Sequence, residues 1–547
     1  MDQTRQDDKL ETLDVSKIIG PKAKVYRAFL DPIGYHLLLS IKPKDVEPLP
    51  ELLYIAPRTN QPFKPRMSGK ARGHLVTSVA WNSDATQTST GQILLGTTRG
   101  LIFEAEISTE SSFLSSGTIE KSWKQVYDIG KGQASAPITG LEYHRVPKSK
   151  KFFILATTPS RFYQFQGVIS GDPETERPLL VHVFNDYLHK PDEYMELPST
   201  LKSSCLSFCY QPKDQGKLAA KWPLYPEKFG WLTQQGIYTG LIDSSGTESV
   251  TVECQLISME NIVNPISFVL TEFHAIIVYP QMVRGICLLN EQVVFEDDLD
   301  MVIKGIERDP MTGTVYVFSD YAIHKYNLDH EDKHIWKVFL EKSDFENALK
   351  YCAHDEVKKD QVLTKQASDL FEKELYIQSA QIYAQTRGGD FEAVCLKFLL
   401  KEQNEALLHY LRKRLDMVRP SEKTQLTMII VWLVEIHLNK MGAKGNVPKQ
   451  TADLTNEEVE AAYEAFDDQT SEELMTLMKN RKVSECVEQN RNTFYGLLAS
   501  HGDKTNLIKF ANIMNDHDRV IRYHLQDKEY EPVLSVLENQ LKQGMTF

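Results

Sequence analysis

The spacing of apolar residues changes once along this 547-residue chain, close to residue 336. Before that point they form short runs rich in Ile, Val, Phe, Tyr and Thr and bounded by Gly, Pro, Asn, Asp or Ser, which predicts β-strands. After it they recur every three or four residues and predict amphipathic helices. A chain of this length also exceeds what one hydrophobic core usually serves. We therefore expect a polar segment 1–19, a β domain 20–335, an α domain 336–537 and a short tail 538–547.

A strand–turn–strand unit recurs in the β domain. In each unit an apolar strand ends in a small or polar pair, a tight turn follows and a second strand returns. Equivalent points are Gly96-Thr97-Thr98, Ala156-Thr157-Thr158, Thr233-Gln234-Gln235-Gly236 and Phe318-Ser319-Asp320. Their separation, roughly 40 to 80 residues, suits propeller blades with loop insertions. Because no helical segment separates the units, we favour a WD40-like β-propeller over a pair of β-sandwiches, which is the alternative.

The α domain reads as a series of short helices. Ser343 and Glu346 have the spacing of a capping box in front of Phe345, and Thr455 and Glu458 repeat it. Several helices place an aromatic residue, then a small or apolar residue three or four positions on, then another apolar side chain, which lets neighbouring helices approach closely. We therefore expect an α-solenoid of helical hairpins, with an ordinary helical bundle as the alternative. The stretch 441–456 lacks an apolar face and reads as a loop.

The most apolar run lies between Leu426 and Leu438, inside a helix that we expect to open at Ser421 and end at Lys440. It contains Glu435 and His437 and is far shorter than the roughly 20 apolar residues of a membrane-spanning helix. We expect a buried helix in which Trp432 contributes to the solenoid core. Any work at a membrane would then be peripheral.

Charge and cysteine content narrow the class of protein. The formal net charge is −13, which argues against a dedicated nucleic-acid binder because phosphate contacts need a basic face. The seven cysteines are scattered and none forms a C-x-x-C pair, a pattern typical of reduced thiols in a cytosolic protein. The polar, acidic first residues do not resemble a signal peptide.

Two stretches resemble ligand-binding motifs only superficially. Residues Gly96 to Gly100 read G-T-T-R-G, but a phosphate-binding loop needs a lysine and a following helix, and a strand follows here. Asp297, Asp298 and Asp300 could face a hard cation, yet the glycine and distal glutamate of a calcium loop are missing. A solvated acidic turn is the better interpretation.

The remaining candidates also favour structural roles. Cys205 and Cys209 have no nearby Cys or His to complete a zinc site, so we read them as buried thiols. His501-Gly502-Asp503 suits a helix stop better than a catalytic site. No hydrolase, zinc-protease or kinase motif is present. We expect no enzymatic activity, no catalytic, cofactor-binding or metal-ligating residue, and no cofactor; the sequence names no partner-binding residue.

An ordered series of short motifs resembles the Pep-three/Deep-orange family and extends over about residues 20 to 537. The matching residues are Phe29-Leu30-Asp31, Gly34, His36-Leu37-Leu38, Leu75-Val76, Ser78-Val79, Trp81-Asn82, Ser89-Thr90-Gly91, Ile93-Leu94, Gly96-Thr97, Ile102-Phe103-Glu104-Ala105-Glu106, Trp336, Phe339-Leu340, Phe345, Ala348, Tyr351-Cys352, Ala393, Lys397-Phe398-Leu399, Thr424-Gln425, Trp432-Leu433 and Leu497-Leu498-Ala499-Ser500-His501-Gly502-Asp503.

The resemblance implies a propeller followed by a solenoid, as the residues themselves predict. It also implies a non-catalytic core subunit of the class C tethering complexes HOPS and CORVET, which support vesicle docking and SNARE-mediated fusion on late endosomes, lysosomes and vacuoles. The implied partners are the other class C subunits, with SNAREs and Rab GTPases contacted directly or through the complex. The implied location is the cytoplasmic side of these membranes.

Two departures from the family pattern limit what the resemblance carries. Members usually have further sequence before the part matching Lys22 to Leu38, so we expect an incomplete propeller. They also continue beyond the equivalent of Leu537 with more helices and a RING-type zinc domain, whereas this sequence has no Cys after Cys486. Zinc binding and ubiquitin ligase activity are therefore not carried over. The other alternative is a vesicle-coat or intraflagellar-type transport subunit, because such proteins also join a propeller to a solenoid.

Overall fold

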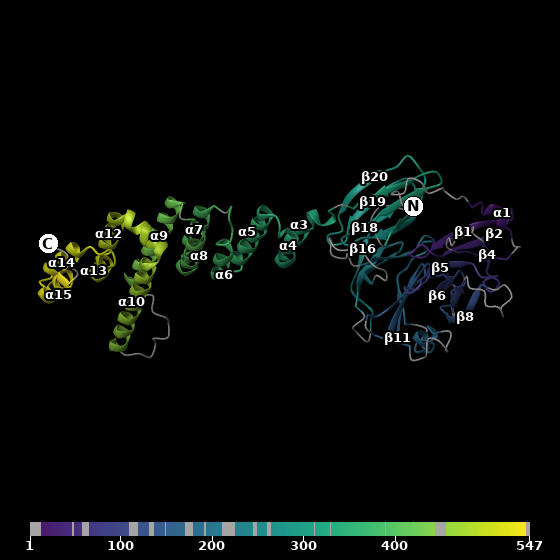
Figure 1. Cartoon of the computed structure of the whole chain (residues 1–547), viewed down its shortest axis with the longest axis horizontal. Coiled ribbons are helices and arrows are strands. Elements are labelled where there is room, and N and C mark those ends of the chain that lie inside the picture. Colours follow the sequence, from purple (N-terminus) through teal and green to yellow (C-terminus); the bar gives the residue numbers. More distant parts are fainter. Residues whose placement is uncertain are drawn as a thin grey trace. The chain divides into compact units, whose positions relative to one another are not determined.

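The computed structural model describes residues 13–45, 49–56, 65–108, 119–130, 136–147, 149–169, 179–190, 193–210, 225–243, 249–259, 264–310, 312–328, 330–388, 390–419, 421–442 and 456–542. The chain divides into two compact units, Met1–Asp332 and Lys333–Phe547. We call them the propeller unit and the helical unit. Figure 1 shows the strands of the first and the helices of the second.

Six antiparallel sheets, labelled A to F in chain order, make up the described part of the propeller unit. In each sheet every strand pairs with the next one along the chain, and sheets A to E have four strands while sheet F has three. The strands are β1 (Ala23–Leu30), β2 (Leu37–Pro43), β3 (Glu51–Ile55) and β4 (Arg66–Met67) in A; β5 (Val76–Ala80), β6 (Ser89–Thr97), β7 (Leu101–Ser108) and β8 (Glu120–Asp128) in B; β9 (Gly140–Arg145), β10 (Lys151–Thr157), β11 (Arg161–Val168) and β12 (Met195–Glu196) in C; β13 (Leu206–Tyr210), β14 (Pro226–Leu232), β15 (Gly236–Ile242) and β16 (Thr251–Ser258) in D; β17 (Ser267–Leu270), β18 (His274–Val278), β19 (Met282–Cys287) and β20 (Val293–Asp298) in E; and β21 (Ile303–Arg308), β22 (Val315–Ser319) and β23 (Ile323–Tyr326) in F.

Successive sheets share their hydrophobic cores. One cluster of buried side chains joins A to B, and further clusters join B to C, C to D, D to E and E to F. The first strands of successive sheets also contact one another, from β1 to β21, so they surround a common axis. Small four-stranded meanders stacked around an axis are the blades of a β-propeller. The predicted WD40-like propeller is confirmed, and the sandwich alternative is wrong.

Burial on both faces explains why the strands read as almost continuous apolar runs. In β3, Leu52 and Tyr54 point to the cluster shared with sheet B, while Leu53 and Ile55 point to the opposite side of sheet A. A strand packed on both sides loses the alternation of polar and apolar residues that a half-exposed strand shows.

The last and first sheets lack such a shared core among the described residues. The free side of sheet A instead packs against Val15 and Ile19. Val15 directly precedes the short helix α1 (Ser16–Ile19), and Ile19 is its last residue. The one sheet described with three strands is F, at the end of the propeller, whereas sheet A at its start has all four. The loss of an opening blade therefore stays a prediction.

The recurring unit predicted from sequence corresponds to one position in the blades. Each of these turns joins the second strand of its sheet to the third: Thr97 and Ser319 are the last residues of the second strands of sheets B and F, and Thr158 and Thr233 directly follow those of sheets C and D. Each hydroxyl closes its hairpin: the Thr233 hydroxyl, for example, donates to the carbonyl oxygen of Gly236 at 2.9 Å. The equivalence of these turns is confirmed, and the hydroxyl group is the physical reason for the repeated Thr or Ser.

One insertion covers the contact between sheets B and C. Helix α2 (Val181–Asn185) lies between β11 and β12, and its Val183 and Phe184 are fully buried in the cluster that joins the two sheets. The carboxylate of Glu104 in β7 accepts hydrogen bonds from the backbone N–H groups of Leu179 and Leu180, both at 2.8 Å. A negative charge at these unpaired N–H groups holds the start of the helix in place.

In the helical unit the helices follow one another in a row, from α3 to α15 (Figure 1). Its helices contact mainly their close neighbours in sequence, the pattern of a solenoid, so the predicted α-solenoid is confirmed. They are the 3-10 helix η1 (Glu331–His334), which begins in the propeller unit, and α3 (Ile335–Glu341), α4 (Phe345–Cys352), α5 (Glu356–Glu372), α6 (Tyr376–Tyr383), α7 (Phe391–Leu399), α8 (Asn404–Met417), α9 (Lys423–Gly442), α10 (Asn456–Lys479), α11 (Arg481–Gln489), α12 (Arg491–Ser500), α13 (Lys504–Ile513), α14 (His517–Gln526) and α15 (Tyr530–Lys542).

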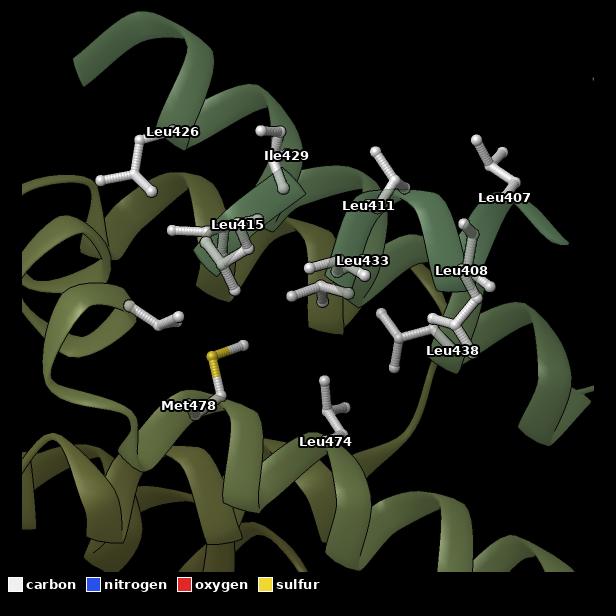
Figure 2. Packing of buried hydrophobic residues seen from close by; sticks show 14 of the residues in the cluster. Leu407, Leu408, Leu411, Leu415, Leu426, Ile429, Leu433, Leu438, Leu474 and Met478 are labelled. Atoms are coloured by element: carbon white, nitrogen blue, oxygen red, sulfur yellow. The ribbon is translucent and has the colours of Figure 1, made fainter. Parts of the chain in front are cut away.

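A continuous hydrophobic cluster runs from α5 to α14. Figure 2 shows part of it, where Leu411 of α8, Leu433 of α9 and Leu474 of α10 point into one layer between the helices. Trp432 lies at the edge of this cluster rather than inside it: it is partly buried and its ring stacks on Phe391 with 5.9 Å between ring centroids. The predicted buried helix is confirmed, with this qualification for Trp432.

Tight turns join many of these helices through a single residue with positive φ. Ser343, Glu374, Glu402, Gly502 and Asn515 occupy this position, with φ between 52° and 70°. In most of these turns the next residue donates its N–H to a carbonyl five positions earlier, as Gln403 does to Phe398 at 3.0 Å. This is the Schellman arrangement, which satisfies carbonyl groups at a helix end and reverses the chain at once.

Three predicted helix boundaries change. The residue that caps α4 is Asp344, whose carboxylate accepts from the N–H of Asn347, while Ser343 has the positive φ of the preceding turn. The capping box assigned to Ser343 is therefore wrong by one position. Helix α9 begins at Lys423 rather than Ser421 and includes Met441 and Gly442. Thr455 and most of the predicted loop, residues 443–455, lie outside the described residues.

Candidate functional site

Within the described ranges, no three His, Cys, Asp or Glu side chains lie close enough together to hold a metal ion. Among those same residues, no helix is both long enough and apolar enough to cross a membrane. The candidate residues predicted from the sequence and the hollows of the surface are the remaining places where a functional site could lie.

The G-T-T-R-G stretch is a β-hairpin. Thr97 ends β6, and its hydroxyl both accepts from the N–H of Leu101 and donates to the carbonyl of Leu101, each at 3.1 Å. Strand β7 follows directly, so no helix start points its N–H groups at the turn. The turn closes a blade and has no phosphate-binding geometry.

The acidic stretch predicted as a turn begins within a strand: Asp297 and Asp298 are the last two residues of β20, and Asp300 follows it. The carboxylate of Asp297 accepts a hydrogen bond from the Tyr326 hydroxyl at 2.6 Å, which links sheets E and F. Burial, together with this carboxylate, raises the pKa of Tyr326 well above its ordinary value. Asp297 belongs to a contact between blades, and among the residues that the structure describes no group of cation ligands is gathered around it.

The two closely spaced cysteines are thiols in the cluster that joins sheets D and E. Cys209 in β13 is buried, with its sulfur 3.5 Å from the Arg308 guanidinium, and Cys205 lies just before the same strand at the edge of the cluster. Burial raises the pKa of both thiols, and Arg308 only partly offsets this for Cys209. The prediction of a buried thiol is confirmed for Cys209, whereas Cys205 is only partly buried.

The H-G-D stretch joins two helices. Gly502 supplies the positive φ of 70° after α12, and Asp503 caps α13 by accepting from the N–H of Asn506 at 3.0 Å. His501 is 3.3 Å from the carboxylate of Glu435 in α9, an ion pair when the imidazole is protonated. These contacts account for all three residues as helix connectors.

Sequence reasoning missed a charged pair near the propeller axis. Arg27 of β1 donates to the carbonyl oxygen of Thr77 in β5 at 2.8 Å. Its positive charge also acts on Glu307 in β21, the first strand of sheet F: the surrounding protein raises the pKa of Glu307, whose side chain keeps access to solvent, and Arg27 lowers it in part. The two residues are 280 positions apart, so no local pattern could have revealed their proximity.

A second missed group holds the end of the propeller together. One oxygen of Glu331 in η1 accepts from the Thr271 hydroxyl at 2.5 Å, from the N–H of Phe273 at 2.7 Å and from His274 Nδ1 at 2.8 Å. Burial alone would raise the pKa of this carboxyl group, but the hydrogen bonds from His274, Thr271 and Phe273 outweigh it and the pKa is lowered.

The hollows on the described surface include three that are open to solvent. One, of about 270 Å³, lies between sheets B and C. Another, of about 610 Å³, lies between α9 and α11 and is lined by residues such as Thr427 and Cys486. A third, of about 330 Å³, is formed by α10, α12 and α13; burial and the carboxylates of Asp503 and Asp468 raise the pKa of Asp467 in its wall. These hollows suit binding rather than catalysis.

A propeller followed by a solenoid, with structural roles for every candidate residue, defines the class of interaction scaffolds; neither fold is catalytic in general. Comparison with known proteins narrows this class. The model of the Pep3/Vps18/deep orange β-propeller domain matches residues 3–328, and that of the first half of the Vps18 α-solenoid domain matches residues 328–516. The chain belongs to the Pep3/Vps18/deep orange family, and no enzymatic activity is indicated.

Individual relatives extend the comparison over almost the whole chain. It is 34% identical over 525 residues to the vacuolar protein sorting-associated protein 18 homolog of Danio rerio, covering 94% of this chain and 50% of that protein. It is 31% identical to the homolog of Drosophila melanogaster, covering 95% of this chain and 52% of that protein. Identity to the vacuolar membrane protein pep3 of Schizosaccharomyces pombe is 24%, covering 95% of this chain and 53% of that protein. The chain thus spans about half the length of these relatives.

Proposed function

We propose that this protein is a non-catalytic scaffold subunit of a class C vacuolar sorting complex of the HOPS or CORVET type. The observation that carries the proposal is that two models of one family match consecutive parts of this chain: the propeller model comes first, and the model of the first half of the solenoid follows directly. In this role the protein supports vesicle docking and SNARE-mediated fusion in transport from endosomes to lysosomes or vacuoles. Its partners are other class C subunits, and through them SNAREs and Rab GTPases.

The mechanism that we propose is architectural. A solenoid exposes a long surface to which several partners can bind, and a propeller provides a rigid body with many loop-bearing edges. Contacts that are weak one by one add up when they are held on a single chain, because each binding event raises the effective concentration for the next. Membrane attachment is then peripheral, on the cytoplasmic face of late endosomes and lysosomes or vacuoles.

Purification of the tagged 547-residue chain from cells tests this proposal. We expect other class C vacuolar sorting subunits to co-purify in stoichiometric amounts, and a matched chain carrying Phe398→Asp in the helical core to lose those that bind the solenoid. Recovery of vesicle-coat or intraflagellar-transport subunits in their place would contradict the proposal and support the coat-type alternative.

Elemental analysis addresses the ubiquitin ligase alternative separately. A RING domain binds zinc through four-ligand sites, so a ligase of that kind carries stoichiometric metal. We expect the purified 547-residue chain to contain no stoichiometric zinc and to transfer no ubiquitin from a charged conjugating enzyme. Zinc at one or more ions per chain would overturn the non-catalytic assignment.

A further inference from the structure

The hollow between sheets B and C has the features of a peptide-binding pocket. It measures about 270 Å³ and is lined from sheet B by the loop Asn82–Asp84 and Gln92. Sheet C contributes Tyr143, Arg145, Lys150 and Phe152, and the inserted segment contributes Ile169, Leu179 and Leu180. Such a volume suits one or two side chains rather than a large cofactor.

The walls of this pocket are held rigidly. The Tyr143 hydroxyl donates to the backbone carbonyl of Gln92, which fixes the first strand of sheet C to the second strand of sheet B. On the other side, the carboxylate of Glu104 holds the N–H groups of Leu179 and Leu180 at 2.8 Å. A pocket whose walls are already fixed loses little conformational entropy when a ligand enters.

The floor and the rim differ in chemistry. Leu179 and Leu180 are buried and Phe152 is partly buried, so they form an apolar floor. Arg145 and Lys150 are exposed at the rim. Arg145 Nε donates to the carbonyl oxygen of Ser149 at 2.8 Å and, within the described residues, neither cation forms an ion pair with a carboxylate. Asp84 is the single carboxylate among the described lining residues.

This distribution selects the occupant. An apolar side chain fits the floor, the side chains of Asn82, Ser83 and Gln92 can hydrogen-bond to a peptide main chain, and the two rim cations favour carboxylates next to the apolar residue. The charged residues that line the pocket, two cations and one carboxylate, are therefore net positive, whereas the chain has a formal net charge of −13. A small cluster of cations on an acidic protein attracts an anionic partner specifically at that point.

We propose that the pocket between sheets B and C binds a short acidic peptide segment of a partner protein, with one bulky apolar side chain in the pocket and flanking carboxylates on Arg145 and Lys150. This inference goes beyond the scaffold role proposed above and holds whether or not the chain assembles with class C subunits. It gives the propeller a recognition site of its own for an extended segment.

Fluorescence anisotropy with the full 547-residue chain tests the proposal. The probe is a labelled eight-residue peptide with one Phe flanked by Asp and Glu. Two further peptides replace the Phe by Ala, or the acidic residues by Asn and Gln. We expect saturable binding of the first peptide and at least fivefold weaker binding of the other two, with the electrostatic part of the difference shrinking at 0.5 M NaCl.

Matched variants locate the binding. Arg145→Gln with Lys150→Gln removes both rim cations at exposed positions, and we expect five- to tenfold weaker binding with an unchanged melting temperature. The control, Lys42→Gln with Lys202→Gln, removes two exposed cations from sheet A and from the segment before sheet D and should leave binding unchanged. A third variant, Ser83→Trp, narrows the pocket and should weaken the Phe peptide more than the Ala peptide.

Three outcomes would overturn the proposal. They are no saturable binding of the acidic Phe peptide, equal loss of affinity in the rim and control variants, and binding of vesicles containing phosphatidylserine that needs Arg145 and Lys150 while the peptide does not bind. The last result would assign the rim cations to a lipid surface instead of a peptide.

Discussion

Glu331 has three hydrogen-bond donors directed at one of its oxygens, and its side chain is 18% exposed. A partly buried carboxylate with such partners stabilises the folded state as long as it is ionised. These donors lie in or next to sheet E, 57 or more positions earlier in the chain. Glu331 therefore connects the segment that follows sheet F to the preceding blade.

We expect Glu331→Gln to lower the free energy of unfolding of the propeller unit by about 2 kcal/mol at pH 7. Because the pKa of Glu331 is lower in the folded than in the unfolded state, its stabilising effect is present above the ordinary value of 4.5 and is lost as the pH falls through the folded value. Urea denaturation at pH 7 and pH 4 measures this. The difference in free energy of unfolding between wild type and variant should be smaller at pH 4 than at pH 7. An equal difference at both pH values would show that ionisation of Glu331 does not contribute to stability.

Trp432 tests the packing of the helical unit. Since its ring is partly buried and stacks on Phe391, we expect Trp432→Ala to cost about 3 kcal/mol, the lower end of the range for large aromatic residues in a core. Thermal denaturation of the helical unit provides the measurement. Leu400→Ala, at a side chain that is 83% exposed, is the control and should change the melting temperature little. Equal melting temperatures of the two variants would contradict a stabilising contact between Trp432 and Phe391.

The helices of the second unit are joined by turns that place ordinary residues at positive φ. Glu374 and Glu402 have φ of 62° and 55°, a region that costs residues with a Cβ atom roughly 1 kcal/mol relative to glycine. Among the turn residues named above, Gly502 and Asn515 are of the two types that adopt this conformation most readily, while Ser343, Glu374 and Glu402 are not. The sequence therefore does not predict these turns as one recurring motif, although it does predict the helices between them.

We expect Glu374→Gly and Glu402→Gly to stabilise the helical unit by about 0.5–1 kcal/mol each, because glycine adopts positive φ without strain. Gly502→Ala should destabilise it by about 1 kcal/mol for the same reason. Chemical denaturation followed by circular dichroism at 222 nm gives both values. Loss of stability in the glutamate variants would mean that their side-chain contacts outweigh the relief of backbone strain.

At the scale of the whole molecule, the chain divides into two compact units, and each contains hydrophobic clusters of its own. Each unit therefore has cores of its own, and the chain should unfold in more than one step. Phe229 and Phe398 are both completely buried, one in each unit, which makes them a matched pair of probes.

We expect differential scanning calorimetry of the 547-residue chain to show two transitions. Phe229→Ala should lower only one of them and Phe398→Ala only the other, each by the equivalent of about 3–5 kcal/mol. A single transition that both substitutions shift equally would show that the two units unfold as one cooperative body.

The order of the elements could be read from the chain because strand and helix periods are local properties. Short runs bounded by turn residues predict blades, and hydroxyl residues such as Thr233 mark the same hairpin in several of them. Helical boundaries were less accurate: Asp344, one position after the predicted Ser343, caps its helix because Ser343 is needed in the preceding turn. Capping depends on backbone geometry that neighbouring helices impose.

From the chain alone one can read a β part and an α part, scattered thiols and a resemblance to one family of scaffolds. The folded structure was needed to show which sheets share a core, that the charge of Arg27 acts on Glu307 280 positions away, and that Arg145 and Lys150 stand at the mouth of an apolar pocket. The physical reason is that the spacing of apolar residues shows which side of a single segment is buried. A pocket, or the approach of two charged groups, depends instead on which distant segments pack together.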